Sequence, residues 1–492
     1  MFDRTVAPLL DILQHVSQRD GVPFYVPGHK KGRGAPPKLL QWWGTEVFRA
    51  DLTELPQLDN LAAPEGAIAE AQALAAEVFG ARRTWFLVNG STAGIIAAIL
   101  ATCQTGDKII LPRNVHKSAI SGLILAGAIP IFVHPTYNRD WDLPLGISPT
   151  AVAAALEAHP DAKAVMLVSP TYQGVCSDIA SIAQIAHQRQ IPVIVDEAHG
   201  AHFTFHPDLP TPALEAGADV AIQSIHKVLG ALTQASMLHV RGDRIDEGQL
   251  DRALQLVQSS SPSYLLMASL DAARQQMATT GRSLASQTLQ LSQKARTRLS
   301  EMPQLSILEM PLSPTPGFFD LDPTRLMVKV TRLGMSGYDA DEILEHRFGV
   351  TAELVERRYL GFVISLGNTA ADIDRLIEGL ATLSGESVHS HSSNEFLLDL
   401  SHPDTFPAPP PMSPREAFFA PLETISVSRS VGCLSGELIC PYPPGIPVLM
   451  PGEEITQTAI DILQQVRECG GTITGCSDPN LETIQVVRGR SI

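Results

Sequence analysis

The sequence predicts an α/β protein with a mostly parallel sheet that is covered by helices. From about residue 84, short apolar runs rich in β-branched residues alternate with longer segments of helical periodicity, as in βαβ units. The runs are apolar throughout, which is typical of strands buried on both faces. The 492-residue chain also exceeds one typical core, so two or three domains are expected.

Seven apolar runs are expected to form the strands of this sheet. They are Thr84–Asn89, Lys108–Pro112, Ile129–His134, Ala164–Ser169, Ile191–Asp196, Val220–Ser224 and Ser236–Val240. The segments between them fit crossover helices, and Ser177–Gln190 shows the spacing through Ile179, Ile182, Ile185 and Ala186. Ligands bind at the carboxyl ends of strands in such sheets. Four polar stretches occupy these ends: Asn89–Thr92, Ser169–Tyr172, Asp196–His199 and Ser224–Lys227.

The remainder of the chain is expected to form smaller domains. After residue 300 strand and helix patterns mix, as in an α+β domain, and a stretch rich in Pro and Ser follows. The expected division is an N-terminal segment at 1–60, a large sheet domain at 61–300, a small α+β domain at 301–384, a linker at 385–414 and a C-terminal α+β domain at 415–492.

The composition argues against several classes of protein. The formal net charge of −16 disfavours nucleic acids and anionic membrane surfaces as partners, because both require basic faces. The most apolar stretch, Ala119–Val133, is broken by glycine and proline and is shorter than the ~20 residues of a spanning helix. The amphipathic stretch Met1–Asp20 does not have the apolar core of a signal peptide. We expect a cytoplasmic protein.

The cysteines are sparse and show no common metal-ligand spacing. There are six of them: Cys103, Cys176, Cys433, Cys440, Cys469 and Cys476. None forms a C-x2-C pair, so no metal site is expected. We interpret all six as reduced thiols of a cytosolic protein.

Asp196 is the first candidate for chemistry, because it ends the apolar run Ile191–Val195 in the stretch Asp196-Glu-Ala-His199. A carboxylate beside a pyridine nitrogen raises the pKa of that nitrogen and keeps it protonated. A protonated ring is the better electron sink, so pyridoxal 5′-phosphate (PLP) is one candidate partner of Asp196. The alternatives are a metal-binding or helix-capping aspartate.

Lys227, in Ser224-Ile-His-Lys227, follows the next expected strand. Lysine is seldom buried, and desolvation at a strand end would lower its pKa and free its amine as a nucleophile for a Schiff base. A surface lysine is the commoner case in general. The pairing with Asp196 favours the PLP hypothesis.

Two further strand ends carry candidate binding residues. Asn89-Gly-Ser-Thr-Ala-Gly94 opens the apolar helix Ile95–Ala101, so Gly90, Ser91 and Thr92 could hold a phosphate at a helix N-terminus. The alternative is a simple capped helix. His116, in Asn114-Val-His-Lys-Ser118, could stack on an aromatic cofactor, although a lone histidine is more often structural.

These stretches together resemble the bacterial ornithine/lysine/arginine decarboxylases, which have the aspartate aminotransferase fold (PLP fold type I). The resemblance covers nearly the whole chain. The matching motifs are Pro27-Gly-His-Lys30, Asp51-Leu-Thr-Glu54, Asp59, Asn89-Gly-Ser-Thr92, His116-Lys-Ser118, Asp196-Glu-Ala-His199, Ser224-Ile-His-Lys227, Ser261-Pro-Ser-Tyr264, Pro441-Tyr-Pro-Pro-Gly-Ile-Pro447 and Pro451-Gly-Glu453. Each motif is weak alone, and their order and spacing are specific.

The resemblance implies PLP as cofactor and a role for each matching residue. Lys227 would bind the cofactor covalently, Asp196 would pair with the pyridine nitrogen, and His116 would stack on one ring face, with Ala198 near the other. The expected catalytic residues are Lys227, His116, Asp196 and His226. The expected cofactor-binding residues are Gly90, Ser91, Thr92, His116, Asp196, Ala198, His199, Ser224, His226, Lys227, Ser260 and Ser261.

The resemblance also implies a homodimer with shared active sites. A serine at Ser260 or Ser261 would contact the phosphate of the neighbouring subunit's cofactor, with residues 1–60 as a dimerisation arm. Pro27-Gly-His29 lies near the start of the chain, so the resemblance is to the shorter, Bacillus-type branch without the N-terminal wing domain. A decamer built through wing domains is therefore not expected.

The expected reaction is decarboxylation of a basic L-amino acid, feeding polyamine synthesis. The expected order of preference is arginine to agmatine, then lysine to cadaverine, then ornithine. Glu353 is the candidate for the distal cation of the substrate, with a surface glutamate as the alternative. An aminotransferase or an aldolase or lyase of the same fold stays open, as does an inactive regulatory homologue.

Overall fold

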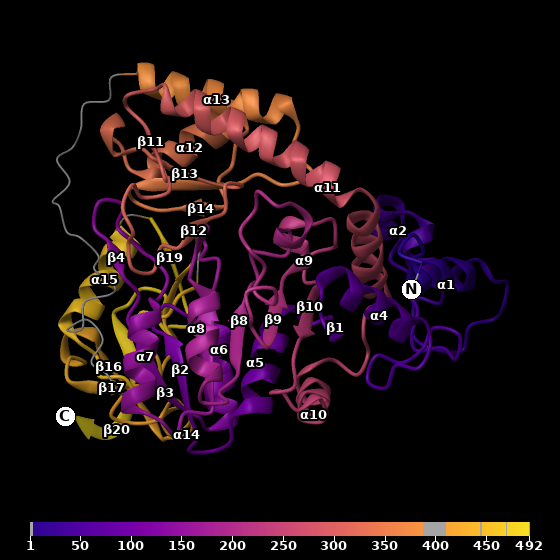
Figure 1. The fold of residues 1–492 in the computed structure, drawn as a ribbon, viewed down its shortest axis with the longest axis horizontal. Helices are drawn as coiled ribbons and strands as arrows, with labels where there is room; N and C mark the ends of the chain where they lie inside the picture. Colours follow the sequence, from indigo (N-terminus) through magenta and orange to yellow (C-terminus); the bar gives the residue numbers. More distant parts are fainter. Residues whose placement is uncertain (1–2, 387–409, 443–444, 469, 492) are drawn as a thin grey trace. The chain divides into compact units, whose positions relative to one another are not determined.

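The computed structural model describes residues 3–386, 410–442, 445–468 and 470–491, which divide into two compact units. The first unit comprises the chain up to 101 together with 196–285, and the second comprises 102–195 and 286–492. Most of the expected linker at 385–414 lies outside the described residues, as do Cys469 and the dipeptide Pro443–Pro444. The domain boundaries given above therefore stay predictions. Figure 1 labels the elements in chain order.

The first unit begins with helices. These are α1 (Pro8–Gln18), α2 (Pro37–Trp43), α3 (Thr45–Ala50) and α4 (Ala67–Phe79). Helix α1 packs on α3 and α4 through a face that buries Leu9 and Leu13. Its first turn is also fixed by the buried Asp271, whose Oδ2 accepts a hydrogen bond of 2.9 Å from the Leu9 backbone N–H. The N-terminal segment is thus anchored by both apolar burial and a buried carboxylate.

Three antiparallel strands form the sheet of the first unit. Their order is β1 (Arg83–Leu87), β10 (Ser236–Val240) and β9 (Val220–Gln223). The expectation of a parallel strand at Ser236–Val240 was wrong. The connection at residues 224–235 contains only the short helix α9 (Ile225–Val228), whereas a parallel return usually runs through a full crossover helix. The chain therefore reverses direction into β10.

Helix α5 (Gly90–Thr102) packs closely against the sheet of the first unit. A Cβ at Gly94 would lie 2.7 Å from Leu87 Cδ1 and 2.9 Å from Ile222 Cγ2, so only glycine permits this approach. The unit also contains η1 (Phe203–Phe205), α10 (Glu247–Val257) and the start of α11 (Tyr264–Ser300). The close packing fixes the N-terminus of α5 beside the end of β1.

The second unit contains the parallel strands that the apolar runs predict. Their order is β8 (Val193–Asp196, whose last residue belongs to the first unit), β6 (Ala164–Val168), β2 (Lys108–Pro112) and β3 (Ile129–Val133). Strand β2 pairs in parallel with both β3 and β6. The helices are α6 (Lys117–Ala126), α7 (Pro149–Ala158) and α8 (Ile179–His187), and α8 buries Ile179, Ile182 and Ala186 as its periodicity predicts.

Residues after 300 first form a four-stranded antiparallel sheet with two helices. The sheet order is β11 (Ser306–Ile307), β13 (Arg325–Lys329), β15 (Tyr359–Val363) and β14 (Leu354–Val355). The helices α12 (Gly337–Phe348) and α13 (Ala370–Gly385) each begin with a capping box. The core includes Leu326, Val328, Leu360 and Leu376. Short elements found elsewhere in the second unit are β4 (Tyr137–Asn138), β5 (Leu143–Pro144), β7 (Val175–Cys176), β12 (Asp320–Leu321) and η2 (Thr331–Leu333).

The C-terminal part of the second unit is a compact α+β segment. Its elements are α14 (Pro414–Phe419), β16 (Leu422–Ser426), η3 (Val427–Arg429), β17 (Cys433–Ser435), β18 (Cys440–Tyr442), α15 (Gln457–Glu468), β19 (Thr472–Thr474) and β20 (Thr483–Ser491). Helix α14 contacts α6, and the Arg415 guanidinium donates to the carbonyls of Ile124 and Leu125, both at 2.9 Å. Among the described residues, no helix combines the length and apolarity needed to cross a membrane.

Candidate active site

Asp196 lies at the end of β8 in a buried position. Its Oδ1 accepts a hydrogen bond of 3.2 Å from the Ala198 backbone N–H, which holds the following turn against the carboxylate. Burial raises the pKa of Asp196, and the positive charge of Lys227 acts in the opposite direction. Asp196 is therefore a buried acid whose charge depends on a nearby cation.

Lys227 lies on α9, directly after β9, and its Nζ is 2.9 Å from His199 Nε2. An ammonium group can only donate, so Nε2 of His199 accepts when the lysine is charged, and the ring proton of neutral His199 is then on Nδ1. Asp196 and His199 belong to the same short segment and both act on the lysine. The structure thus brings together the buried Asp196 and His199 and the partly buried Lys227 as a polar cluster.

The start of α5 and the start of α9 meet through two serines. Ser224 Oγ donates a hydrogen bond of 3.0 Å to Ser91 Oγ, and Ser224 is fully buried. Gly90 has φ +73°, which favours glycine where the chain turns from β1 into α5. Thr92 is exposed in the first turn of α5. Free N–H groups of this turn and neighbouring hydroxyls are suited to an anion.

His226 is fixed by a backbone carbonyl. Its Nδ1 is 2.9 Å from the carbonyl oxygen of Ala235, so Nδ1 carries the proton and donates. Burial lowers the pKa of His226. The lowered pKa therefore favours the neutral ring, in which Nε2 does not carry a proton.

Ser260 and Ser261 are exposed in the connection between α10 and α11. The run is tied to the start of α5, since the Ser259 backbone N–H donates to Asn89 Oδ1 at 3.0 Å. Ser259 and Ser260 also line a cavity of about 460 Å³ together with Trp85. Ser260 and Ser261, the two candidates for the phosphate contact, thus lie at the surface of the subunit, near the start of α5.

His116 and Glu353 belong to the second unit. His116 is the N-cap of α6, where its Nδ1 accepts a hydrogen bond of 3.2 Å from the Ser118 backbone N–H and lies 2.8 Å from Ser118 Oγ. Its ring proton is accordingly on Nε2. Glu353 is exposed just before β14, and its backbone N–H donates to the carbonyl of Gly361 at 2.9 Å. No role for either side chain follows from these contacts alone.

The sequence interpretation missed a buried polar network beneath the Asp196 cluster. The Glu197 carboxylate accepts hydrogen bonds of 2.7 Å from the Ala213 backbone N–H and 2.8 Å from Gln223 Nε2. Gln223 Oε1 therefore accepts from His239 Nε2 at 3.1 Å, and His239 Nδ1 accepts from Thr84 Oγ1 at 2.8 Å. Two features of the sequence could have indicated this network. Glu197 is a second acid directly after Asp196, and Gln223 is a polar residue at the end of an apolar strand.

The titration of this network follows from its burial. Burial raises the pKa of Glu197 to about 8 and lowers the pKa of His239 to about 3. His239 is therefore neutral, in agreement with the tautomer that its two hydrogen bonds require. The network links residues of β1, β10 and β9 to Glu197, which directly follows β8. Each side chain donates to the next in the same direction, from Thr84 to Glu197.

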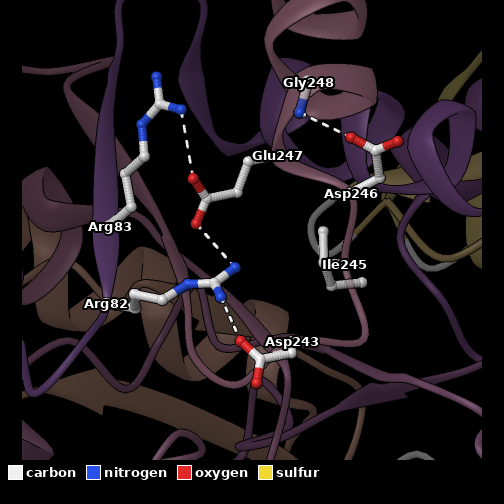
Figure 2. A pocket seen from close by; sticks show the side chains of 7 residues that line it. All are labelled: Arg82, Arg83, Asp243, Ile245, Asp246, Glu247 and Gly248. Carbon is white, nitrogen blue, oxygen red and sulfur yellow. Dashed lines mark hydrogen bonds and ion pairs between the residues drawn. The ribbon is translucent and has the colours of Figure 1, made fainter.

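Figure 2 shows a second cavity, of about 560 Å³, at the start of α10. Glu247 accepts from Arg82 at 2.8 Å and from Arg83 at 3.4 Å, and Arg82 also pairs with the exposed Asp243. None of the predicted site residues lines it. These are largely exposed ion pairs, which contribute little to stability. Within the described ranges, no group of three or more His, Cys, Asp or Glu residues is arranged to hold a metal ion.

Comparison with known proteins gives a consistent result over nearly the whole chain. The family model described as "Orn/Lys/Arg decarboxylase, major domain" matches residues 7–372, and the model of the C-terminal domain matches 404–479. The chain is 38% identical to arginine decarboxylase of Bacillus subtilis, covering 98% of each chain, and 38% identical to that of Halalkalibacterium halodurans, covering 98% of this chain and 97% of the other.

A solved structure of similar fold supports the predicted fold class. The constitutive lysine decarboxylase of Escherichia coli superposes with a TM-score of 0.83 at 21% identity, covering 99% of this chain and 82% of that chain. At this identity the likeness concerns the fold alone. The expected fold, with its mostly parallel sheet and smaller α+β domains, is confirmed.

Proposed function

Because the chain belongs to the Orn/Lys/Arg decarboxylase family, we propose that it is a PLP-dependent enzyme that converts L-arginine to agmatine and CO2. Lysine is the second substrate in the proposed order and ornithine the third. The observation that carries the proposal is the polar cluster of the buried Asp196 and His199 with the partly buried Lys227, at the ends of two strands. The full-length similarity to curated Bacillus arginine decarboxylases places arginine first.

The residues of the first unit fit PLP in chemistry and position. When bound, PLP supplies an electron sink for the electron pair left on Cα as CO2 departs. The Lys227 amine would bind the aldehyde, and the Asp196 carboxylate would pair with the ring nitrogen. Ser91, Thr92 and Ser224, with the first N–H groups of α5, would hold the phosphate. A cationic ring nitrogen would stabilise the ionised form of Asp196, which burial otherwise disfavours.

The structure supports Lys227 over His226 as the group that returns a proton to Cα. Nδ1 of His226 is engaged by the Ala235 carbonyl, and the lowered pKa of the ring disfavours a second proton on Nε2. The Lys227 amine can hold a proton, and His199 Nε2 lies 2.9 Å away to orient it. We assign His226 to a binding role near the phosphate, as the family resemblance implies.

The remaining roles are proposals of the same kind. His116 and Ala198 would contact the two faces of the cofactor ring, and Glu353 would bind the guanidinium of the substrate. The exposed position of Glu353 leaves its carboxylate available for such a contact. Arginine decarboxylation would feed polyamine synthesis in the cytoplasm, and the free thiols of the described cysteines support a reducing compartment.

We also propose a homodimer whose subunits share their active sites. Large apolar side chains of the N-terminal segment are exposed in the single subunit, among them Phe24 at 92% and Trp42 at 79%. Such exposure on a folded protein is typical of a surface that pairs with another chain. Ser260 and Ser261 are exposed as well, which supports a contact with the partner's cofactor.

The proposal is tested by measuring CO2 release from arginine, lysine and ornithine in parallel, with PLP present. We expect kcat/KM to be highest for arginine and agmatine to be the product. A keto acid formed without CO2 would instead indicate an aminotransferase. An inactive protein that binds no PLP, detected by its visible absorbance, would contradict the proposal.

A further inference from the structure

The connection between β2 and α6 is bound to the C-terminal segment within the second unit. Arg113 directly follows β2 and lies three residues before His116. Its Nε donates to Glu453 Oε1 at 3.1 Å and its Nη2 to Glu453 Oε2 at 2.8 Å. Nη1 donates to the Pro447 carbonyl at 2.8 Å, and Nη2 also donates to the Val448 carbonyl at 3.3 Å.

This ion pair is buried on both sides. The side chain of Arg113 is 3% exposed and that of Glu453 is 4% exposed. Glu453 Oε2 accepts a further hydrogen bond of 3.0 Å from the Met450 backbone N–H. Burying two charges is costly unless their geometry is good and other hydrogen bonds satisfy them. The fork-to-carboxylate geometry and the three backbone partners meet this requirement.

The same C-terminal segment also reaches the His116 side chain. The Lys117 backbone N–H lies 3.4 Å from the carbonyl oxygen of Gly445 and donates to it. A Cβ at Gly445 would lie 3.6 Å from His116 Cδ2 and 3.7 Å from Nε2, so the backbone of Gly445 borders the ring. On its other edge, the ring is held by Ser118 through Nδ1. Ser118 thus orients the imidazole, and the backbone of Gly445 lies beside it.

We propose that the described residues at 445–453 position His116, with the Arg113–Glu453 pair anchoring its connection and Gly445 lying beside its ring. This rests on the proposed function, in which His116 lies on the cofactor ring. It goes beyond that function by giving the C-terminal segment a part in cofactor binding. Arg113, Gly445 and Glu453 are positioning residues, because they act on the cofactor only through His116.

A matched pair of glycine substitutions separates this role from general stability. Gly445 has φ +86° and Gly432 has φ +81°, so alanine is strained equally at either position. A Cβ at Gly432 would have no atom within 4 Å, whereas one at Gly445 would lie at ordinary van der Waals distance from His116 and Tyr442. Relaxation of the strained backbone would therefore be transmitted to the His116 ring only from position 445. We expect Gly445→Ala to raise the dissociation constant for PLP of the full-length apoenzyme roughly two- to tenfold, which is the range of one aromatic ring contact. Gly432→Ala should leave it unchanged.

A double-mutant cycle with His116→Ala identifies the route of the effect. Gly445→Ala should cause no further loss of PLP affinity in the His116→Ala background, and should alter the visible circular dichroism of bound PLP only when His116 is present. Equal PLP affinities for the Gly445→Ala and Gly432→Ala variants would overturn the proposal. So would a full additional loss in the His116→Ala background.

Glu453→Gln tests the anchor itself, because it leaves the Arg113 guanidinium buried without its carboxylate. Where this variant folds, its PLP affinity should fall at least as far as that of Gly445→Ala, and an unchanged affinity would contradict the anchoring role. A wild-type protein that binds no PLP would sink the proposed function instead. A wild-type protein that binds PLP, with a Gly445→Ala variant of equal affinity, would sink this inference alone.

Discussion

Asp196 and Glu197 are adjacent buried acids that belong to two regions with different properties. Asp196 interacts electrostatically with Lys227, whose amine also contacts His199 Nε2 at 2.9 Å. Glu197 faces Ala213 and Gln223, and both of its oxygens accept hydrogen bonds from these protein donors. The difference shows how burial alone does not identify a catalytic group. The partners decide whether a buried acid supports the fold or serves chemistry.

The largest effect is expected for Lys227→Ala, which removes the amine proposed to bind PLP. We expect kcat to fall by more than about 10³-fold, because covalent attachment and proton transfer are both lost. The visible absorbance of covalently bound PLP should disappear while the thermal midpoint of the ligand-free protein changes little. Near-normal activity in this variant would refute the assignment of Lys227.

Asp196→Asn is expected to have the next largest effect on activity. The amide cannot stabilise a protonated ring nitrogen, so kcat should fall by about 10²-fold, as for other losses of a charge-stabilising group. The ligand-free variant should be no less stable than wild type, because a neutral amide replaces a carboxylate that burial disfavours. Paired kinetic and thermal measurements check both parts, and a large loss of stability with normal kcat would reverse the roles of the two acids.

Glu197→Gln should mainly affect stability. The amide nitrogen introduced at position 197 would face Gln223 Nε2, so two donors would meet. Gln223 would have to turn over, which reverses the direction of each hydrogen bond in the network as far as Thr84. We therefore expect a loss of about 1–3 kcal/mol in the free energy of unfolding. The kcat of the folded, PLP-saturated variant should change less than that of Asp196→Asn. Urea unfolding with parallel kinetics tests this, and a larger kcat loss at unchanged stability would contradict it.

The pH dependence of stability gives an independent test of Glu197. Its pKa is raised to about 8 in the folded protein, from an ordinary value of 4.5. An acid whose pKa is raised by folding stabilises the folded protein fully at pH values below its unfolded-state pKa. This contribution is lost as the pH rises through the folded-state pKa. Wild type should therefore lose stability relative to Glu197→Gln between about pH 4.5 and pH 8. A difference that is independent of pH would show that Glu197 titrates normally.

The smallest effect is expected for Arg82→Ala in the exposed ion-pair cluster of Figure 2. Exposed pairs contribute up to about 1 kcal/mol, and salt screens them. The unfolding free energies of wild type and Arg82→Ala should differ by less than about 1 kcal/mol at high salt, and kcat should not change. A substantial loss of activity would indicate that this surface affects the catalytic cluster.

Much of the fold follows from the sequence, since all seven apolar runs form strands whose ends agree within two residues. The direction of β10 did not follow, because apolar content reports burial and not orientation. The partnership of Lys227 with His199, the Glu197 network and the contact between His116 and Gly445 were also not predictable. Each depends on side-chain direction and on pairing between distant segments, which periodicity and motif spacing do not encode.

We propose that Lys227, beside Asp196 and His199, carries the cofactor of an arginine decarboxylase. The release of CO2 from L-arginine carrying a labelled carboxyl group tests this role when it is measured with PLP for wild type and Lys227→Ala. We expect labelled CO2 with equimolar agmatine from wild type and none above background from the variant. Comparable release from both proteins, or none from wild type with any of the three basic amino acids, would contradict it.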